Sequence, residues 1–296
     1  MTRGSAVEEV LGDGGECGAL LRRVAWERTP LGPVEGWPQS LRTAVGIILG
    51  SNYPLYLAWG PRYVQFYNDA YRPICGATKH PAALGQEAAD TWPEVWSTVG
   101  PMVDGALHDG QASWVENQLF LFDRGDLVEE VYLTFSHSPI RDETGAVGGI
   151  FQAVSDVTRG VLGARRLSTL RALTPEARSV DEAAHACMKV LGDNVSDVPF
   201  AALYLREPDG TRASLAATSG VAPGARLAPL SISLTGTGSV TDEAPWPFAL
   251  ALERGAAVRV EEQDDGHDRE NRERDVHPEG PPPVRPRGQP PTQQRT

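Results

Sequence analysis

The chain has 296 residues, enough for about two domains, and 41% of them are hydrophobic, which suffices for a buried core. Its formal net charge of −12 argues against a nucleic-acid-binding surface, because such a surface needs clustered basic side chains to neutralise phosphates. Cys17, Cys75 and Cys187 lie too far apart for a zinc motif or a disulfide framework, and this use of cysteine is typical of a reducing cytoplasm.

No apolar run is long enough to cross a bilayer: the longest, AVGIILG at 44–50, is far too short. The first eighteen residues also lack the apolar core of a secretory signal. The basic residues are arginines apart from Lys79 and Lys189, and with abundant Ala, Gly and Pro this composition indicates a GC-rich bacterial genome. A cytoplasmic bacterial protein without membrane insertion is expected.

The first half of the sequence predicts helices and strands in alternation. Residues 1 to about 18 are rich in glycine and acidic residues and indicate a loose tail. The segment 36–51 is predicted as a helix, because its apolar residues recur on one face. Aromatic and aliphatic runs at 53–60 and 63–68 predict the two strands of a hairpin.

Short helices broken by Pro and Gly lead to a longer predicted helix over 92–110, which Pro101 should bend. Three strands close the unit, over 113–123, 128–140 and 146–156. The order of these elements predicts an α+β fold, with an antiparallel sheet of about five strands and helices on one face.

The second half predicts less regular structure. Residues 159–174 indicate a helical connector, and 179–195 an amphipathic helix. A hairpin with its turn at Pro208-Asp209-Gly210 follows, and then a short helix and the start of a strand. The last segment, 261–296, is rich in proline, lacks aromatic residues and is expected to be disordered, because it cannot bury enough apolar surface.

The layout of residues 36–158 resembles a PAS sensor domain. The residues that carry the resemblance are FYNDAY at 66–71, Gly76, LG at 84–85, SPIRDETGAVGGI at 138–150 and DVT at 156–158. The motifs are individually loose, but their whole run in this order is specific.

The lead-in ERTPLGPVEGWPQSLRTAVGIILGSNYPLYLAWG looks like that of bacterial multidomain sensors in which a PAS unit precedes a GAF unit. A helix followed by PFAALYLREPDG and ASLAATSG resembles the first part of such a GAF domain, itself an α+β fold. The resemblance implies an N-terminal tail and lead-in (1–35), a PAS domain (36–158), a helical connector (159–174), a partial GAF domain (175–260) and a disordered tail (261–296).

A histidine kinase core usually follows the GAF unit in the resembled family, so the resemblance implies the signal-sensing input module of a two-component sensor histidine kinase. The motifs of that core, a phosphoacceptor histidine followed by an acid and the Asn-rich and Gly-rich ATP boxes, do not occur in this sequence. His185 lies on a predicted helix, but Ala186 follows it, so no base stands beside the imidazole. No catalytic residue is assigned, no intrinsic kinase activity is expected, and the sequence is interpreted as a truncated product, a frame-shifted product or a fragment.

Two other interpretations stay open. Serine phosphatases and cyclic-dinucleotide enzymes also carry PAS and GAF units, so the chain could be the input region of such an enzyme. A stand-alone ligand-binding or dimerisation protein is the third class.

The space between the sheet and the short helices is the default ligand site, because small-molecule sites are concave and mostly apolar. Its candidate lining residues are Tyr53, Tyr56, Trp59, Phe66, Asn68, Trp92, Trp96 and Met102. The alternative for most of them is an ordinary place in the core. Asn68 and Asp69 are favoured as helix caps, since short polar side chains there can accept backbone N–H groups. The ligand is an unidentified small molecule.

No cofactor is identified from the sequence. Cys75 lies in PICGAT, which does not match the Asn-Cys-Arg-Phe-Leu-type segment of flavin-binding PAS domains. His108 ends the long helix, where haem-binding PAS domains carry a histidine, but beside Asp109 and Gly110 it is expected to be exposed. His137 is expected to face solvent or pair locally, and no metal site is apparent.

Asp156 and Thr158 stand where the last strand ends and the connector begins. Each has a side-chain oxygen that can accept a backbone N–H group at a helix start. Both a simple cap and a signal-relay junction, the role that the resemblance implies, stay open. The leucine stripe that follows at 167–173 is shorter than a coiled coil requires, so a homodimer through the connector helix is one of two open oligomeric states.

Overall fold

The computed structural model describes residues 10–11, 14–125, 127–174, 176–235 and 246–260. Within these ranges, the residues up to Val161 form one compact unit and those from Leu162 onward form a second. The segment 261–296, predicted to be disordered, lies outside the described residues.

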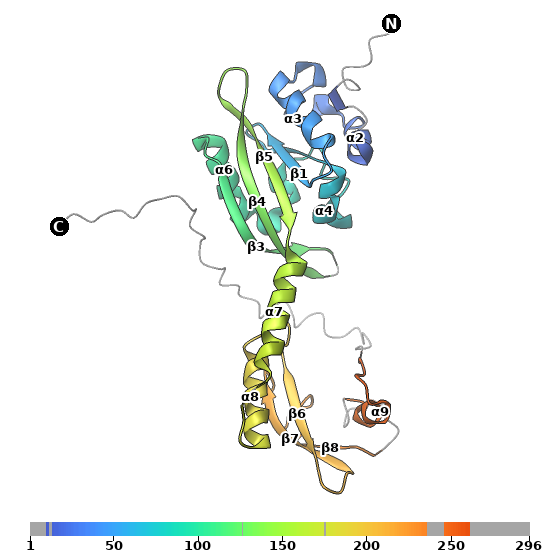
Figure 1. The fold of residues 1–296 in the computed structure, drawn as a ribbon. Coiled ribbons are helices and arrows are strands. Elements are labelled where there is room, and N and C mark those ends of the chain that lie inside the picture. Colours follow the sequence, from blue (N-terminus) through green and yellow to red (C-terminus); the bar gives the residue numbers. More distant parts are fainter. Residues whose placement is uncertain (1–9, 12–13, 126, 175, 236–245, 261–296) are drawn as a thin grey trace, which may run out of the picture. The chain divides into compact units, whose positions relative to one another are not determined.

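The first unit contains an antiparallel sheet of five strands, as the sequence predicts (Figure 1). The strands are β1 (Leu55–Trp59), β2 (Val64–Tyr67), β3 (Ser113–Asp123), β4 (Val128–Arg141) and β5 (Val147–Asp156), in the order β2-β1-β5-β4-β3. The last strand of this unit, β5, therefore lies at the centre of the sheet, where it pairs with both β1 and β4. The central position of β5 matters because this strand leads out of the unit.

Helices surround this sheet. They are α2 (Gly15–Leu21), α3 (Gln39–Leu49), α4 (Arg72–Lys79), α5 (Ala88–Thr91) and α6 (Pro93–Asp109), with short 3-10 turns η1 (Trp26–Arg28), η2 (Val34–Gly36) and η3 (Asp69–Tyr71). Pro101 lies inside α6, as predicted.

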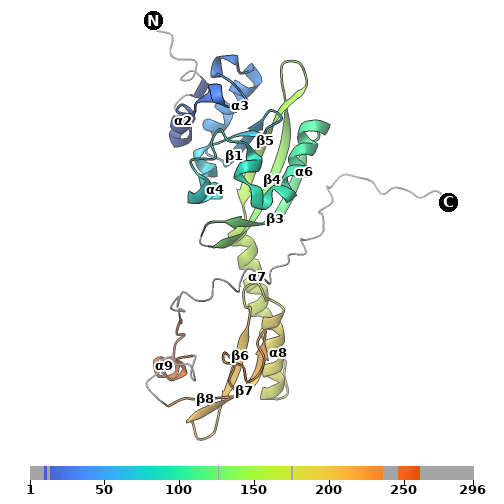
Figure 2. The same ribbon diagram turned by 180° about the vertical axis from the view of Figure 1, so that it is seen from behind.

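Helices cover both faces of the sheet, not one face as the sequence pattern predicts (Figure 2). Helix α6 packs against β3, β4 and β5, whereas α3 packs against β1, β2 and β5. On the α3 side, Phe66 lies against two tryptophans of the lead-in, with ring centroids 5.2 Å from Trp26 and 5.5 Å from Trp37. Periodicity could not show this second layer, because the lead-in is held by contacts distant in sequence.

The loose tail predicted up to about residue 18 is wrong in its last residues, since α2 begins at Gly15. Its first turn is held by Asp69, whose carboxylate accepts the backbone N–H groups of Glu16 (2.9 Å) and Cys17 (2.7 Å). The partner lies more than fifty residues away, so local glycine content gave the wrong expectation. The capping role predicted for Asp69 is real, but the helix that it caps is α2.

Two glycines let β1 and β5 come together. A Cβ atom at Gly148 would lie 2.6 Å from the Trp59 ring, and one at Gly149 would lie 2.5 Å from that ring and 2.6 Å from the Ala58 carbonyl oxygen. Real Cβ atoms do not approach this closely, so both positions require glycine. The expectation that this pair allows a close backbone approach is confirmed.

The second unit contains α8 (Val180–Gly192), the strands β6 (Ala201–Arg206), β7 (Arg212–Ser219) and β8 (Ser231–Ser233) in the order β6-β7-β8, and α9 (Phe248–Arg254). Helix α8 packs on β7 and β6, and Ala184, Met188 and Ala217 are the buried centre of this contact. Ser179 caps α8 by accepting the Glu182 N–H at 3.1 Å.

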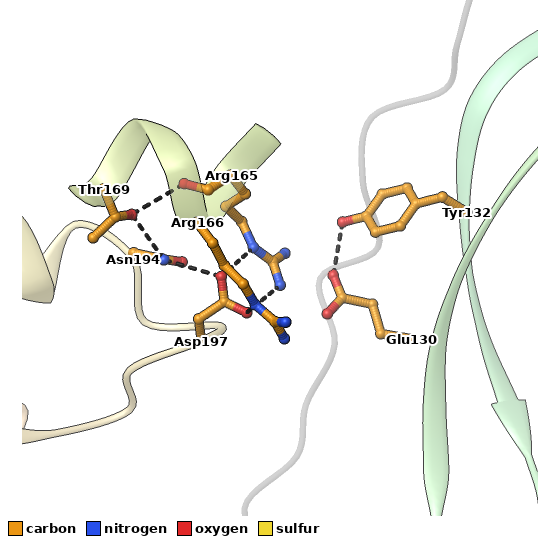
Figure 3. Close-up of polar contacts among 7 residues, drawn as sticks. All are labelled: Glu130, Tyr132, Arg165, Arg166, Thr169, Asn194 and Asp197. Carbon is orange, nitrogen blue, oxygen red and sulfur yellow. Dashed lines mark hydrogen bonds and ion pairs between the residues drawn. The ribbon is translucent and has the colours of Figure 1, made fainter. Parts of the chain in front are cut away.

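Helix α7 (Thr158–Ala172) is tied to the loop after α8 through Asp197 (Figure 3). The carboxylate pairs with Arg165 at 2.8 Å and Arg166 at 3.4 Å, and it accepts the Asn194 amide at 3.0 Å. These guanidinium and amide donors lower the pKa of Asp197 below its ordinary value.

Asn68 is a fully satisfied buried amide that joins three segments. Its Oδ1 accepts the backbone N–H groups of Leu55 and Tyr71, both at 3.2 Å. Its Nδ2 donates to the carbonyl oxygens of Ser51 (2.8 Å) and Tyr53 (2.7 Å). The cap predicted for this residue is confirmed at η3, and the same side chain also fixes the start of β1.

We expect Asn68→Ala to lower the free energy of unfolding by about 2–4 kcal/mol, because it leaves several buried backbone groups without partners. Urea unfolding of the whole chain measures the change. The matched control is Asn52→Ala, since Asn52 is exposed in the loop before β1. Equal stability of the two variants would contradict the role assigned to Asn68.

Candidate functional site

A cavity of about 50 Å³ lies between the inner face of the sheet and helices α5 and α6. Its walls are mainly aliphatic and aromatic. The lining residues are Tyr56, Ala58, Tyr71, Ala88, Trp92, Val95, Trp96, Val99, Val103, Phe120, Phe122, Leu133, Phe135, His137 and Gln152. All of them are buried except Trp96 and Val99 on α6, which are partly exposed.

His137 is the polar group that stands out in this cavity, because it is 0% exposed. Its Nδ1 lies 3.2 Å from the Ser113 hydroxyl, while its Nε2 has no hydrogen-bond partner within the described part of the chain. Burial lowers the pKa of His137 to about 4, so the ring is neutral at physiological pH. A neutral imidazole in this place can donate or accept one further hydrogen bond.

The expectation that His137 faces solvent or pairs locally is wrong in its first part. Along β4 the buried side chains are Val131, Leu133 and Phe135, and His137 continues this alternation into the inner face. The alternation of side chains along β4 places residue 137 on the same face as Val131, Leu133 and Phe135, whereas the polarity of histidine points to solvent. In this strand the alternation decides.

Of the eight candidate pocket residues, Tyr56, Trp92 and Trp96 are brought together around the cavity. Trp59 and Phe66 point to the opposite side, one across the glycines of β5 and the other against the lead-in tryptophans.

The remaining three candidates also lie outside the lining. Tyr53 is 50% exposed and its hydroxyl contacts the Ser155 hydroxyl. Met102 packs against the core from α6, and Asn68 is occupied by four backbone partners. The sequence pattern places aromatic residues in the right layer, but it does not show which face of a short strand each one occupies.

Several lining residues were not foreseen from the sequence. Phe120 and Phe122 of β3 stack with a centroid distance of 5.7 Å, and Phe122 lies 5.4 Å from Trp92. Gln152 of β5 is 8% exposed. The alternating pattern of β3 could have indicated the two phenylalanines; Gln152 carries no such signal, because a glutamine in a strand usually faces water.

The cavity is small compared with the 300–1,000 Å³ of ordinary ligand pockets. The two groups considered for cofactors lie apart from it: His108 is exposed on α6, and Cys75 is a buried thiol whose pKa burial raises to about 12. Within the described residues, no cluster of three or more His, Cys, Asp or Glu is placed to hold a metal ion. None of the helices in those residues is long and apolar enough to pass through a membrane.

The exit from the sheet is built from Asp156 and Thr158. The Asp156 carboxylate accepts the Thr158 N–H at 2.9 Å, and the Thr158 hydroxyl oxygen accepts the Tyr132 N–H of β4 at 2.9 Å. Val157 N–H donates to the Tyr132 carbonyl at 2.9 Å. Asp156 accepts an N–H group at the helix start, as expected, whereas Thr158 accepts one from strand β4 and so fastens the first residue of α7 to the sheet.

Below neutral pH, His137 should destabilise the fold. Its pKa is about 4 in the folded chain and about 6.5 when unfolded, so the unfolded state binds the extra proton between these values. Stability is therefore lost as pH falls from 6.5 to 4, by about 3 kcal/mol from this group. Urea unfolding across this range should show a weaker pH dependence in His137→Phe than in the native chain. His185→Phe, at an exposed histidine, is the control; identical pH dependence in all three proteins would contradict the prediction.

Solved structures that are similar to this chain include named PAS and LOV proteins. A sensory box sensor histidine kinase from Vibrio cholerae is 18% identical, with 40% of this chain and 94% of that chain covered and a TM-score of 0.29. The PAS domain of Bordetella pertussis BvgS is 19% identical, with 45% of this chain and 98% of that chain covered and a TM-score of 0.29. The Rhodobacter sphaeroides LOV protein is 14% identical, with 51% of this chain and 92% of that chain covered and a TM-score of 0.34.

Each of these likenesses covers about half of this chain or less. Neither a scan of protein-family models nor a search of curated proteins finds a match to the sequence.

Proposed function

We propose that the chain is a signal-sensing input module of a two-component sensor histidine kinase. In this proposal the residues 36–158 are a PAS sensor, 159–174 are the connector and 175–260 are a partial GAF domain. The observation that carries it is the geometry of β5: Gln152 lines the cavity, and four residues later the same strand ends at Asp156, the start of the junction with α7.

Sensing would occur by a shift between two conformations. A ligand in the cavity stabilises the arrangement of β4, β5 and α6 that fits it best, and the equilibrium moves toward that arrangement. Because Thr158 bonds to Tyr132 of β4, a change in the pairing of β4 and β5 alters the anchorage of the first turn of α7. The relay therefore requires only a change in the pairing of β4 with β5 near Asp156.

The chain supplies input and no phosphotransfer in this proposal. His185 is exposed on α8, and its Nδ1 lies 2.8 Å from the Asp181 carbonyl oxygen of the preceding turn. The residue that follows it is Ala186 and not an acid, so it lacks the arrangement of a phosphoacceptor histidine.

We also propose that α7 joins two copies of the chain. None of its residues is buried, and Leu167 and Leu170 are 47% and 64% exposed. Apolar side chains on a helix that buries nothing favour pairing with a second helix.

The relay predicts that filling the cavity changes the junction. Val103→Leu adds one methylene at the cavity wall, and we expect altered amide hydrogen exchange at residues 157–162, measured by mass spectrometry on the whole chain. Val45→Leu adds the same group at a buried position of α3, away from the cavity, and should leave that exchange unchanged. If both variants leave the junction unchanged, the proposed relay is wrong.

The proposed pairing predicts that Leu167→Glu with Leu170→Glu converts a dimer to a monomer, because charges cannot be buried unpaired in the interface. Light scattering after size-exclusion chromatography measures the mass. Ile47→Glu, at a 57% exposed position on α3, is the control and should leave the dimer intact. A monomeric native chain would rule out this association.

A further inference from the structure

A row of polar side chains crosses the inner face of the sheet. Ser113 of β3 stands directly opposite His137 of β4, His137 opposite Gln152 of β5, and Gln152 opposite Tyr56 of β1. Directly opposed residues lie within side-chain reach of one another. The row runs through a surface that is otherwise apolar, and His137, Gln152 and Tyr56 all line the cavity.

Two members of the row have unused hydrogen-bonding capacity. His137 Nε2 has no partner although it is fully buried, and no side-chain hydrogen bond of Gln152 occurs among the residues that the structure describes. Buried polar groups are nearly always paired with protein, water or ligand. A fully buried imidazole nitrogen without a partner, beside the Gln152 amide in the same cavity, therefore marks a place where a polar group of another molecule fits.

The lining contains no Asp, Glu, Lys or Arg, and the two cations that stack on lining rings, Lys79 on Trp92 and Arg124 on Phe122, are already paired with Glu94 and Glu129. Removing a charge from water into such surroundings is strongly unfavourable. The cavity therefore selects against carboxylates, phosphates and ammonium groups. It favours an uncharged molecule with one polar end and an apolar remainder.

The apolar part of the wall is mainly aromatic, with Trp92, Trp96, Phe120 and Phe122 on it. Rings pack against rings in offset or edge-on arrangements that add to simple burial. The volume of about 50 Å³ is smaller than the roughly 150 Å³ that admits benzene to an engineered cavity. A one-ring molecule therefore enters only if one wall moves.

Helix α6 is the wall that can move. The two partly exposed lining residues, Trp96 and Val99, both belong to it. Pro101 follows directly and cannot donate the backbone hydrogen bond of a regular helix at its position. An outward shift of α6 would enlarge the cavity without disturbing the strands that carry the polar row.

We propose that this cavity binds a small uncharged one-ring molecule with a hydroxyl group, which hydrogen-bonds to His137 Nε2 and to the Gln152 amide. A hydroxyl group both donates and accepts, so it suits either neutral tautomer of His137 and either end of the amide. The proposal deepens the sensing function above and rests on it.

The test compares three probes of one ring each with the whole chain: phenol, toluene and benzoate. Binding is followed by calorimetry and by ligand-observed NMR. We expect phenol to bind at least tenfold more tightly than toluene, because one net hydrogen bond corresponds to roughly tenfold and the hydroxyl group makes two, and we expect benzoate not to bind. His137→Phe should weaken phenol binding by a similar factor and leave toluene binding unchanged, while the exposed His185→Phe changes neither.

The outcomes separate this proposal from the sensing function. Equal binding of phenol and toluene, or phenol binding that survives His137→Phe, overturns the assigned ligand class and leaves an apolar sensor cavity. Binding of benzoate also overturns it. If none of the three probes binds, the assigned ligand class is wrong, whereas the sensing function is judged separately by the exchange measurement at residues 157–162. Gln152→Leu serves as a second variant if His137→Phe does not fold, with the same loss of phenol binding expected.

Discussion

The fold of the first unit depends on one buried amide. Asn68 stands between β2 and the helical segment, and its four hydrogen bonds reach backward to the loop after α3 and forward to η3. With both the donors and the acceptor of its side chain used, the amide fixes where β1 starts. The remaining strands pair outward from β1 through β5, so the position of the inner face follows from this point. A polar side chain thus sets the geometry of a cavity that is itself almost entirely apolar.

The order of helices and strands could be predicted from the sequence. The face of the sheet on which each side chain lies could not. Period-two alternation predicted β4, aromatic and aliphatic runs predicted β1 and β2, and the glycines of β5 allow the close backbone approach expected of them. It did not show that Phe66 turns away from the cavity, because β2 has four residues that are all buried and its alternation is invisible. It also misjudged α2, whose anchor on Asp69 is a contact between distant segments.

The candidate site shows the same division. Aromatic content indicated a cavity in the right layer, and Tyr56, Trp92 and Trp96 line it. The two polar residues that give it chemical character were missed, since His137 and Gln152 are residue types that usually face water. His137 and Gln152 meet because each faces inward from its strand and because the strands pair in this register. The register depends on how β1, β4 and β5 pair in space.

Trp59 lies across Gly148 and Gly149, and this contact limits how β1 and β5 can move relative to each other. Sliding β1 by one residue along β5 would bring the Trp59 ring against a side chain instead of bare backbone. The resulting steric clash disfavours any other register of these two strands. In the proposed sensing mechanism, a response to a ligand would therefore come from the helices and from the pairing of β4 with β5 near Asp156, and not from sliding of β1 along β5. The glycine pair therefore keeps the β1 side of the cavity in one alignment. Under the proposed relay, movement of the opposite wall would reach the end of β5 and would not be lost in sliding between β1 and β5.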